Sequence, residues 1–423
     1  MKLTNEKKCE LDTLVLKLAT RLSKVSYVED VLKKSGLEYK EYSLAVSYPA
    51  LCILFSELQA HFPKENFELV AHKYLEKINN SFETNRVDDT SLFDGLSGVG
   101  YAAVCMSQNG KFYQGFINSL NQKIIERVEQ NLVEYRKNPV NELFYDVMYG
   151  ITGTGNYLLN FSYKDEIKDT LNNILRYIME LCDPDYTDIP KFTVDPHDSP
   201  LFTAIRNKGE KYVNLGVSHG IPGMLLFLIK SYEAGIGDQK QLDTIKFVAN
   251  YISKCCIKKE KEIFWESQKI VGMRNMGATA ARDAWCYGTP GVAYALLRAS
   301  KILRDEEMYY LAVDSMKLSI KERREIISPT FCHGLSGLCC LARKFYEYTS
   351  DDYFYGAYTK LLGEIVNLYN EDAPFGFKDK EIKKGRIVSE DEIGLLTGAS
   401  GVILTILSCY KPVATKWDSI FLI

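Results

Sequence analysis

The chain has 423 residues, of which 46% are hydrophobic, and its 52 Lys and Arg against 55 Asp and Glu leave a formal net charge of −3. A charge so close to balance argues against a general nucleic-acid binder or a polybasic membrane binder. The 11 cysteines are an odd number dispersed through a long chain, which disfavours a disulfide framework and favours free thiols in a reducing compartment.

The first segment, residues 1–25, interrupts its apolar residues with charged ones. This pattern predicts an amphipathic helix and not the apolar core of a signal peptide. The longest apolar runs, such as residues 224–229, are far shorter than the roughly 20 residues of a membrane-spanning helix. We therefore expect a soluble, cytoplasmic protein.

Glycine-rich turns followed by an apolar run recur along the chain. Six clear copies have their first glycine at positions 95, 150, 220, 288, 334 and 398, at intervals of 55, 70, 68, 46 and 64 residues. An earlier copy at residues 47–54 lacks the glycines and has Pro49-Ala50 where a later copy has Pro222-Gly223. Intervals of this size are typical of a helical-hairpin repeat with insertions.

The residues on both sides of each turn predict helices. The runs after the turns, such as 224–229 and 292–297, are apolar almost all round, which predicts buried inner helices. Segments with charge on one face and apolar residues at helical spacing predict outer helices at 113–135, 164–182, 241–255 and 307–324. Seven such repeats predict an all-α fold, an α/α toroid, with its glycine-rich turns at one end around a central opening.

The unequal intervals indicate insertions between the repeats. Residues 183–215 contain four prolines together with β-favouring residues at 192–194 and 212–213, which predicts a partly β insertion. Residues 262–281 and 373–388 have a similar character, with strands expected at 263–265 and 375–377. No linker or low-complexity stretch marks a second domain, so we expect a single domain over residues 1–423.

Chemically reactive side chains collect at the two positions before the first glycine. The position directly before it holds Asp94, Tyr149, His219, Tyr287, His333 and Thr397, and the position before that holds Cys286 and Cys332 in two copies. Because equivalent positions of a closed repeat face the same space, we expect His219, Cys286, Tyr287, Cys332 and His333 to converge on one sector of the ring. Tyr149 and Asp94 share the position in sectors farther away, which favours structural roles for them.

Two cysteines and a histidine in one sector predict a metal site. Cys286, Cys332 and His333 offer two thiolates and an imidazole, which are strong ligands for Zn²⁺ and leave a fourth tetrahedral position open, as in catalytic zinc sites. The alternative for any single cysteine is a small core residue. The repeat position that the two cysteines share favours the metal.

Four short stretches connect these residues to a known family. They are Asp283-Ala284-Trp285-Cys286-Tyr287-Gly288, Cys332-His333-Gly334, Ser218-His219-Gly220 and Tyr145-Asp146-Val147. With them, and with its glycine-rich repeats in order, the chain resembles the lanthipeptide (lantibiotic) cyclases of the LanC family over nearly its whole length. The resemblance implies an α/α toroid with one zinc ion per chain. The implied reaction joins cysteine thiols of a precursor peptide to dehydroalanine or dehydrobutyrine and forms lanthionine or methyllanthionine thioether rings.

The resemblance also implies residue roles and partners. The zinc ligands would be Cys286, Cys332 and His333, and the remaining active-site residues would be His219, Asp146, Arg282 and Tyr287. The implied partners are a dehydrated precursor peptide with its leader, and a complex with a dehydratase and an ABC transporter at the inner face of the cell membrane. We expect no nucleic-acid partner.

The chemistry of the residues agrees with these roles. Zn²⁺ deprotonates a bound cysteine thiol, which otherwise has a pKa near ~8.5. Addition of sulfur to an alkene gives an enolate, which needs positive charge nearby and then a proton at its α-carbon. We expect His219 to be the general acid, with Asp146 orienting it, Arg282 as an electrostatic partner and Tyr287 as a second donor. The structural alternatives are a helix cap for Asp146 and an ion pair with Asp283 or another loop carboxylate for Arg282.

Three other functions remain open at the level of sequence. A zinc-dependent thiol transferase of the protein prenyltransferase kind would also use an α/α barrel, but the paired cysteines and the repeat motifs fit it less well. A non-catalytic scaffold that holds a precursor peptide has no need of the ligand set. A LanC-like enzyme that adds glutathione to dehydroamino acids would share every motif.

Overall fold

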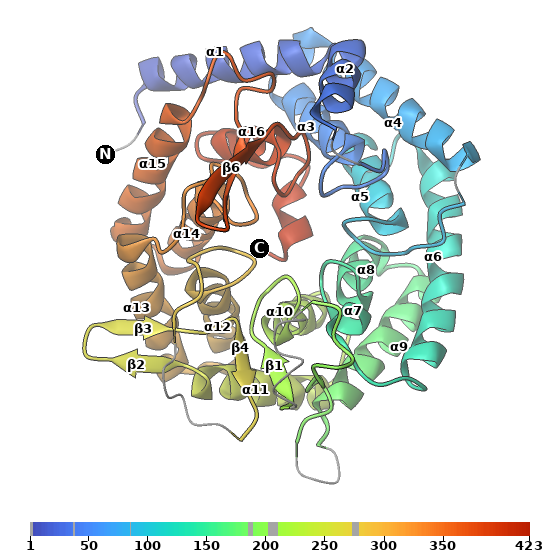
Figure 1. Cartoon of the computed structure of the whole chain (residues 1–423). Helices are drawn as coiled ribbons and strands as arrows, with labels where there is room; N and C mark the ends of the chain where they lie inside the picture. The colour runs from blue at the N-terminus through green and yellow to red at the C-terminus, as the bar shows by residue number, and fades with distance from the viewer. Residues whose placement is uncertain (1–2, 37–38, 85, 185–188, 202–209, 273–278) are drawn as a thin grey trace.

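The helices of the chain form two concentric rings around one axis (Figure 1). The computed structural model describes residues 3–36, 39–84, 86–184, 189–201, 210–272 and 279–423. Within these ranges the inner ring consists of α3 (Tyr48–His61), α5 (Leu96–Met106), α8 (Ile151–Leu158), α10 (Ile221–Glu233), α12 (Thr289–Leu303), α14 (Leu335–Thr349) and α16 (Ala399–Ser408). The outer ring consists of α1 (Asn5–Leu22), α4 (Phe67–Thr84), α6 (Gln114–Tyr135), α9 (Asp165–Cys182), α11 (Gln239–Lys254), α13 (Glu306–Glu322) and α15 (Asp352–Asn367). The predicted α/α toroid is confirmed.

The two kinds of helix differ in burial as their sequences predict. Every residue of α10 from Ile221 to Ile229 is buried, because an inner helix is packed on all sides. In α9 the buried residues Ile167, Leu171, Ile174 and Ile178 recur at helical spacing, which places one apolar face against the inner ring. The four expected outer helices agree with α6, α9, α11 and α13 to within two residues at each end.

The ring is closed by the two ends of the chain. Each inner helix from α3 to α14 packs against the outer helix that follows it in sequence. After α16 no outer helix follows in residues 409–423, and α1 from the other end of the chain packs against it (Figure 1). α16 also packs against α3. The seventh hairpin is therefore assembled from both termini, because closure of the ring brings the otherwise uncovered face of α16 beside the apolar face of α1.

A closed circle of backbone hydrogen bonds joins the segments that precede the inner helices. In each copy within the described residues the residue two positions before the N-cap takes part, namely Ala45, Phe93, Met148, Ser218, Cys286, Cys332 and Leu396. Neighbouring copies are linked by bonds such as Ser218 N to Cys286 O at 3.3 Å and Cys286 N to Cys332 O at 3.3 Å. The glycine-free copy closes the circle, since Leu396 N donates to Ala45 O at 3.1 Å. Equivalent positions therefore lie side by side, as the repeat predicts.

The glycines of the turns allow this crowding. A Cβ on Gly291 would collide with the carbonyl oxygen of Trp285, and the second glycine of the next copy, Gly337, meets the carbonyl of Phe331 in the same way. Gly288 differs from the first glycines of the other copies because its φ is +100°, which only glycine adopts without strain. The backbone conformation of the turn after Cys286 therefore differs from that of the other turns.

The C-terminal segment fills the axis of the ring, where the sequence predicted an opening (Figure 1). In the 3-10 helix η4 (Trp417–Phe421) the ring of Phe421 stacks on Phe331 with centroids 3.6 Å apart and meets Trp285 edge-on at 5.0 Å. The indole nitrogen of Trp285 donates to Phe421 O at 3.2 Å. Trp285 and Phe331, which directly precede Cys286 and Cys332 in sequence, therefore pack against the C-terminal segment.

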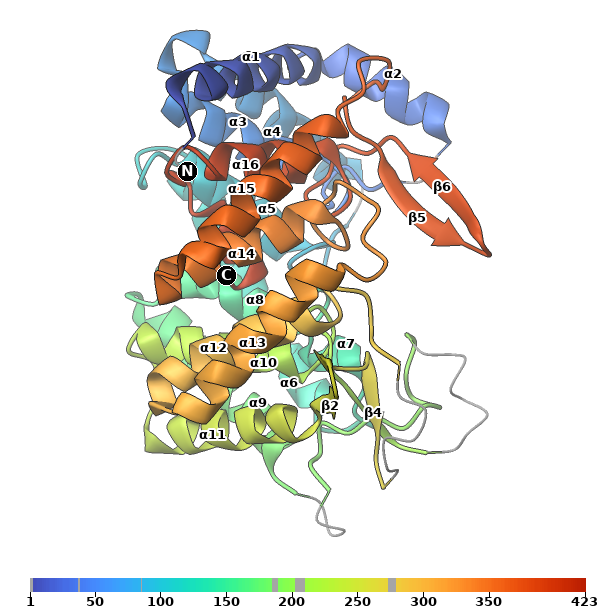
Figure 2. The ribbon, with the colours of Figure 1, turned by 90° about the vertical axis from the view of Figure 1, so that its left-hand side faces the viewer.

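The insertions carry three short antiparallel sheets within the described residues, on one side of the ring (Figure 2). They pair β1 (Tyr212–Asn214) with β4 (Gln268–Ile270), β2 (Ile257–Lys259) with β3 (Glu262–Phe264), and β5 (Asp379–Lys383) with β6 (Arg386–Glu390). The expected strand at 263–265 is confirmed within one residue. The expected strand at 375–377 is wrong, because Gly376 has a φ of +81° that breaks extended backbone, and the hairpin begins at Asp379.

In its described residues the insertion expected at residues 183–215 is partly β, as predicted, and it contains β1. Val194 bridges to Tyr212, and Pro184 bridges to Pro190. Residues 185–188 and 202–209 lie outside the described residues. Across the described chain, no helix combines the length and the apolar content that crossing a membrane requires.

Candidate functional site

A buried carboxylate and an imidazole form one part of the candidate site. Asp146 follows the short helix α7 (Glu142–Tyr145) and is fully buried. Its Oδ2 lies 2.5 Å from Nδ1 of His219, and its Oδ1 accepts from the backbone amides of Tyr149 at 2.6 Å and Gly150 at 2.7 Å. The histidine partner is therefore present on one carboxylate oxygen, while the other holds the turn before α8 and does not cap the helix itself.

This hydrogen bond selects the reactive nitrogen of the imidazole. A carboxylate accepts, so Nδ1 of His219 carries the shared proton and Nε2 is the nitrogen left for proton exchange. The His219 side chain is 16% exposed, whereas that of Asp146 is not exposed at all. The ring can therefore exchange a proton with a ligand while its partner stays out of contact with water.

Two tyrosines flank His219. The ring of Tyr149 stacks on it with centroids 5.8 Å apart, and the ring of Tyr287 lies 6.2 Å away at a tilt. The sequence placed Tyr149 in a sector farther from the expected metal and favoured a structural role, and the backbone circle puts its turn beside that of His219. Its position before the first glycine was the signal that could have identified it.

Tyr287 has a polar partner that the sequence did not indicate. Nδ2 of Asn214, at the end of β1, donates to the Tyr287 hydroxyl at 3.2 Å. Burial raises the pKa of Tyr287, so its hydroxyl stays protonated. Nothing in the spacing of Asn214 relates it to a turn, because it comes from an insertion.

Cys286 and Cys332 lie in contact. Their side chains hydrogen-bond to each other; this bond lowers the pKa of Cys286 against the effect of burial, and the charges of His333 and Arg282 act in the same direction. The same bond, together with burial, raises the pKa of Cys332. The pair therefore tends to hold one proton between two sulfur atoms.

His333 is turned toward a carboxylate that the sequence did not single out. Its Nε2 lies 3.1 Å from Oδ1 of Asp379, the first residue of β5. Burial opposes the charged imidazole, but the hydrogen bond and the charge of Asp379 outweigh it and raise the pKa of His333. The insertion that carries β5 thus supplies a direct contact to one of the expected ligands.

Arg282 pairs with a carboxylate of the same hairpin. Its guanidinium lies 3.7 Å from Oε1 of Glu381, and its side chain is 31% exposed. Asp283, one of the two partners considered from the sequence, is engaged elsewhere, since it accepts from the backbone amide of Arg324 at 2.8 Å. The other alternative was a loop carboxylate; the observed partner is a carboxylate, but Glu381 lies on strand β5 and not in a loop.

The donor set fits a zinc ion in its chemistry. Within the described ranges, no group of three or more His, Cys, Asp or Glu side chains has the arrangement of a metal site. Two sulfur atoms that share a proton, with a histidine whose other ring nitrogen meets a carboxylate, are nevertheless the ligand types and the outer contact that zinc sites use. Because Nε2 of His333 is engaged with Asp379, Nδ1 is the nitrogen that could bind a metal.

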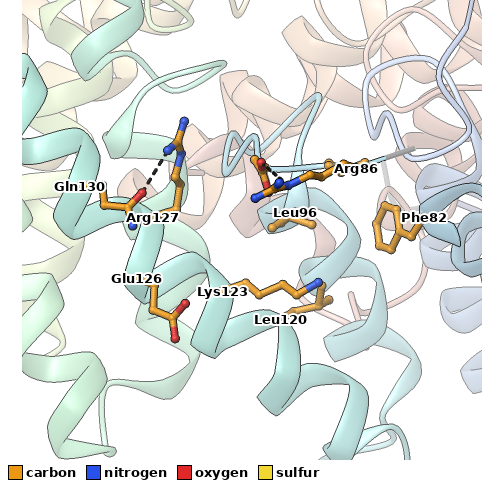
Figure 3. A pocket seen from close by; sticks show the side chains of 10 residues that line it. Phe82, Arg86, Leu96, Leu120, Lys123, Glu126, Arg127 and Gln130 are labelled. Atoms are coloured by element: carbon orange, nitrogen blue, oxygen red, sulfur yellow. Dashed lines mark hydrogen bonds and ion pairs between the residues drawn. The ribbon is translucent and has the colours of Figure 1, made fainter. Parts of the chain in front are cut away.

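A groove of about 530 Å³ lies elsewhere, beside α6 (Figure 3). Its walls are Phe82, Arg86, Val87, Asp88, Leu96, Leu120, Lys123, Glu126, Arg127 and Gln130. Two of its arginines have partners within the groove. Arg86 forms an ion pair with Asp88 at 2.9 Å, and Arg127 donates a hydrogen bond to Gln130 at 3.0 Å. None of these lining residues belongs to the candidate site.

Comparisons with known proteins show which family and which solved structure this chain is similar to. Residues 38–422 match the model of the family described as lanthionine synthetase C-like protein. The nisin biosynthesis protein NisC of Lactococcus lactis subsp. lactis is 22% identical over 360 residues, which is 81% of this chain and 84% of that protein. The solved structure of nisin cyclase superposes with a TM-score of 0.80 at 19% identity and covers 99% of this chain and 98% of its own. The structural likeness supports the α/α toroid.

Proposed function

The chain belongs to the lanthionine synthetase C-like family, and from this premise we propose that it is a peptide cyclase. The proposed reaction adds cysteine thiols of a dehydrated precursor peptide to dehydroalanine or dehydrobutyrine and forms lanthionine or methyllanthionine rings. The chain is similar to a protein named as a cyclase and to one named for the biosynthesis of nisin, and this similarity supports the proposed cyclase activity. The observation that carries the proposal is the placement of a carboxylate-held imidazole and a contacting thiol pair at equivalent positions of adjacent repeats.

The thiol pair and His333 define where the substrate sulfur would be activated. Cys286, Cys332 and His333 would hold one zinc ion, which supplies the positive charge that keeps a substrate thiol deprotonated at neutral pH. The lowered pKa of Cys286 means that one protein thiolate forms readily at this place. The two protein sulfurs are ligands and not nucleophiles, so the thiol that reacts belongs to the peptide.

His219 is suited to the proton transfer. When the thiolate adds to the β-carbon of the alkene, its electron pair moves through the double bond onto the carbonyl oxygen and forms an enolate. Protonation at the α-carbon by Nε2 of His219 completes the addition. The substrate thiol has lost one proton and the α-carbon has gained one, so the mass of the peptide does not change. Asp146 keeps Nδ1 protonated and stabilises the charged ring.

Arg282 and Tyr287 are suited to the developing negative charge. Arg282 is positively charged, and its ion pair with Glu381 engages one guanidinium nitrogen at 3.7 Å in a partly exposed position, which suits it to a negatively charged ligand. The Tyr287 hydroxyl remains a donor at neutral pH because burial raises its pKa. Donors already in place where charge develops lower the barrier without reorganisation.

The test is mass spectrometry with thiol alkylation after incubation with dehydrated peptides. Cyclisation removes alkylatable thiols at unchanged peptide mass. A mass gain equal to one glutathione, when glutathione is present, identifies the family's other activity, addition of glutathione to dehydroamino acids. Peptide that is bound but unchanged in both respects refutes catalysis and identifies a scaffold.

The chemistry also determines the partners in this proposal. Because the reaction consumes dehydroamino acids, a dehydratase must act on the same precursor peptide and its leader beforehand. We include in the proposal a cytoplasmic complex with that dehydratase and with an ABC transporter at the inner face of the cell membrane. Co-purification of the tagged chain with either protein tests it, and recovery of the chain alone from cross-linked cells contradicts it.

A further inference from the structure

The β5–β6 hairpin stands out from the ring on the side where the sheets lie (Figure 2), yet its first residue reaches the candidate site. We propose that Asp379 is a positioning residue of the metal centre, which fixes the orientation of His333 through a hydrogen bond to Nε2. The inference rests on the proposed function, because it presupposes that His333 binds zinc. It makes an inserted hairpin, and not only the toroid, part of the centre.

The contacts of Asp379 concentrate on the segment that precedes α14. Its Oδ1 accepts from Ser328 Oγ at 2.7 Å and from Thr330 Oγ1 at 2.9 Å, and it lies 3.1 Å from Nε2 of His333. The backbone amide of Lys380 donates to Ser328 Oγ at 3.2 Å. The start of β5 is thus bound at several points to the segment that ends in His333.

Burial makes these bonds consequential. Asp379 is only 8% exposed, so its carboxylate depends on hydrogen bonds from protein groups in place of water. Two hydroxyls would suffice to brace the loop. The additional bond to a ring nitrogen restrains the imidazole, and histidines that bind metals commonly donate their other ring N–H to a carboxylate in this way.

A second carboxylate on the same strand supports this assignment. Side chains two residues apart along a strand lie on one face, and Glu381 on β5 lies 3.7 Å from Arg282. One face of β5 therefore contacts both chain segments that carry the expected ligands, at 282–286 and at 328–333. Apolar packing does not hold the tip of the hairpin on the ring, because Ile382 and Ile387 are 54% and 65% exposed.

The experiment measures zinc affinity of the full-length chain by competition with a chromophoric chelator. Asp379→Asn keeps the size of the side chain and an acceptor oxygen for the two hydroxyls but removes the charge that holds His333. We expect zinc affinity to fall roughly 10- to 100-fold, while the thermal midpoint of the metal-free protein stays close to that of wild type. The matched control is Glu390→Gln, which removes the carboxylate directly opposite on β6 and should leave zinc affinity unchanged.

The outcomes separate this inference from the proposed function. If wild type binds zinc and Asp379→Asn binds it as tightly as the Glu390→Gln control, Asp379 is only a loop brace and the inference is overturned. If wild type itself takes up no zinc, the proposed zinc centre fails, whatever the variant does. Asp379→Glu, which keeps the charge but displaces it by one methylene, serves as the second variant if Asp379→Asn folds poorly, and an unchanged affinity there also overturns the inference.

Discussion

The two halves of the candidate site are held in different ways. In the acid–base half, His219 and Asp146, the carboxylate is saturated by two backbone amides and the imidazole. The thiol half consists of Cys286, Cys332 and His333. Its two sulfur atoms interact with each other, and the imidazole contacts Asp379 of the inserted hairpin.

This difference has a physical cause. A carboxylate and an imidazole satisfy each other with one proton, so the acid–base half is complete without a ligand. In the thiol half the pKa of Cys286 is lowered while that of Cys332 is raised, so the state in which both sulfurs are deprotonated is disfavoured without a cation. The thiol half should therefore gain most from a bound cation, and the two halves should respond separately to substitution.

The largest effect is expected in the thiol half. Cys286→Ala or Cys332→Ala removes one of three proposed zinc ligands, so metal analysis should find zinc reduced from about one per chain to a small fraction of that, with cyclisation lost. Cys9→Ala, which removes an exposed thiol, should keep its zinc. A full equivalent of zinc in both cysteine variants contradicts the ligand assignment.

In the acid–base half, His219→Ala should abolish proton transfer and spare the metal. We expect the cyclisation rate to fall roughly 10²- to 10⁴-fold, measured by mass spectrometry, with zinc content unchanged. His72→Ala, at a half-exposed histidine of α4, is the matched control. Loss of zinc from His219→Ala would make His219 a ligand and merge the two halves.

A smaller effect is expected when the partner of His219 loses its charge. Asp146→Asn keeps an oxygen for the amides of Tyr149 and Gly150 but loses a hydrogen bond to a charged group, which contributes about 1.5–3 kcal/mol. The rate should fall roughly 10- to 100-fold, with circular dichroism and zinc content as in wild type. Wild-type activity in this variant would leave Asp146 with the structural role of holding the turn before α8.

The metal-free thiol half should reveal itself by its pH dependence. The pKa of Cys286 is lowered, so its thiolate, and with it the rate of alkylation, should appear at lower pH than for a free cysteine in solution. Peptide mapping of chelator-treated protein identifies the modified residue. Alkylation of Cys332 before Cys286 would reverse the order that the hydrogen bond and the charges of His333 and Arg282 imply.

The smallest effect is expected at the exposed ion pair between the hairpin and the thiol half. Glu381→Gln removes a contact of 3.7 Å between side chains that are each about a third exposed. Such pairs contribute less than about 1 kcal/mol, so denaturant unfolding and zinc content should change little. A loss of stability well beyond that would assign the hairpin to the folding core of the ring.

The repeat itself could be predicted because it depends on residues that are close together in the sequence. Glycines recur where backbones meet, as at Gly291 and Gly337, and apolar runs recur where a helix is enclosed. The spacing before the first glycine then placed Cys286, Cys332 and His333 together, because a repeat that closes on itself brings equivalent positions to the same place.

Contacts between distant segments could not be predicted in this way. Asp379, Asn214 and Glu381 come from insertions that have no counterpart in the other repeats, and the stacking of Tyr149 on His219 depends on how two neighbouring turns face each other. The pairing of α1 with α16 joins segments nearly a chain length apart, and the stacking of Phe421 on Phe331 joins two different repeats.

The sequence by itself determined the toroid, its seven turns and the identity of the reactive groups, because each depends on residues close together in the chain. The tertiary structure decided which groups touch. Whether Asp146 holds His219, and whether His333 is held by Asp379, depends on how the ring closes and how an insertion folds back over it, and those are settled by packing across the whole molecule.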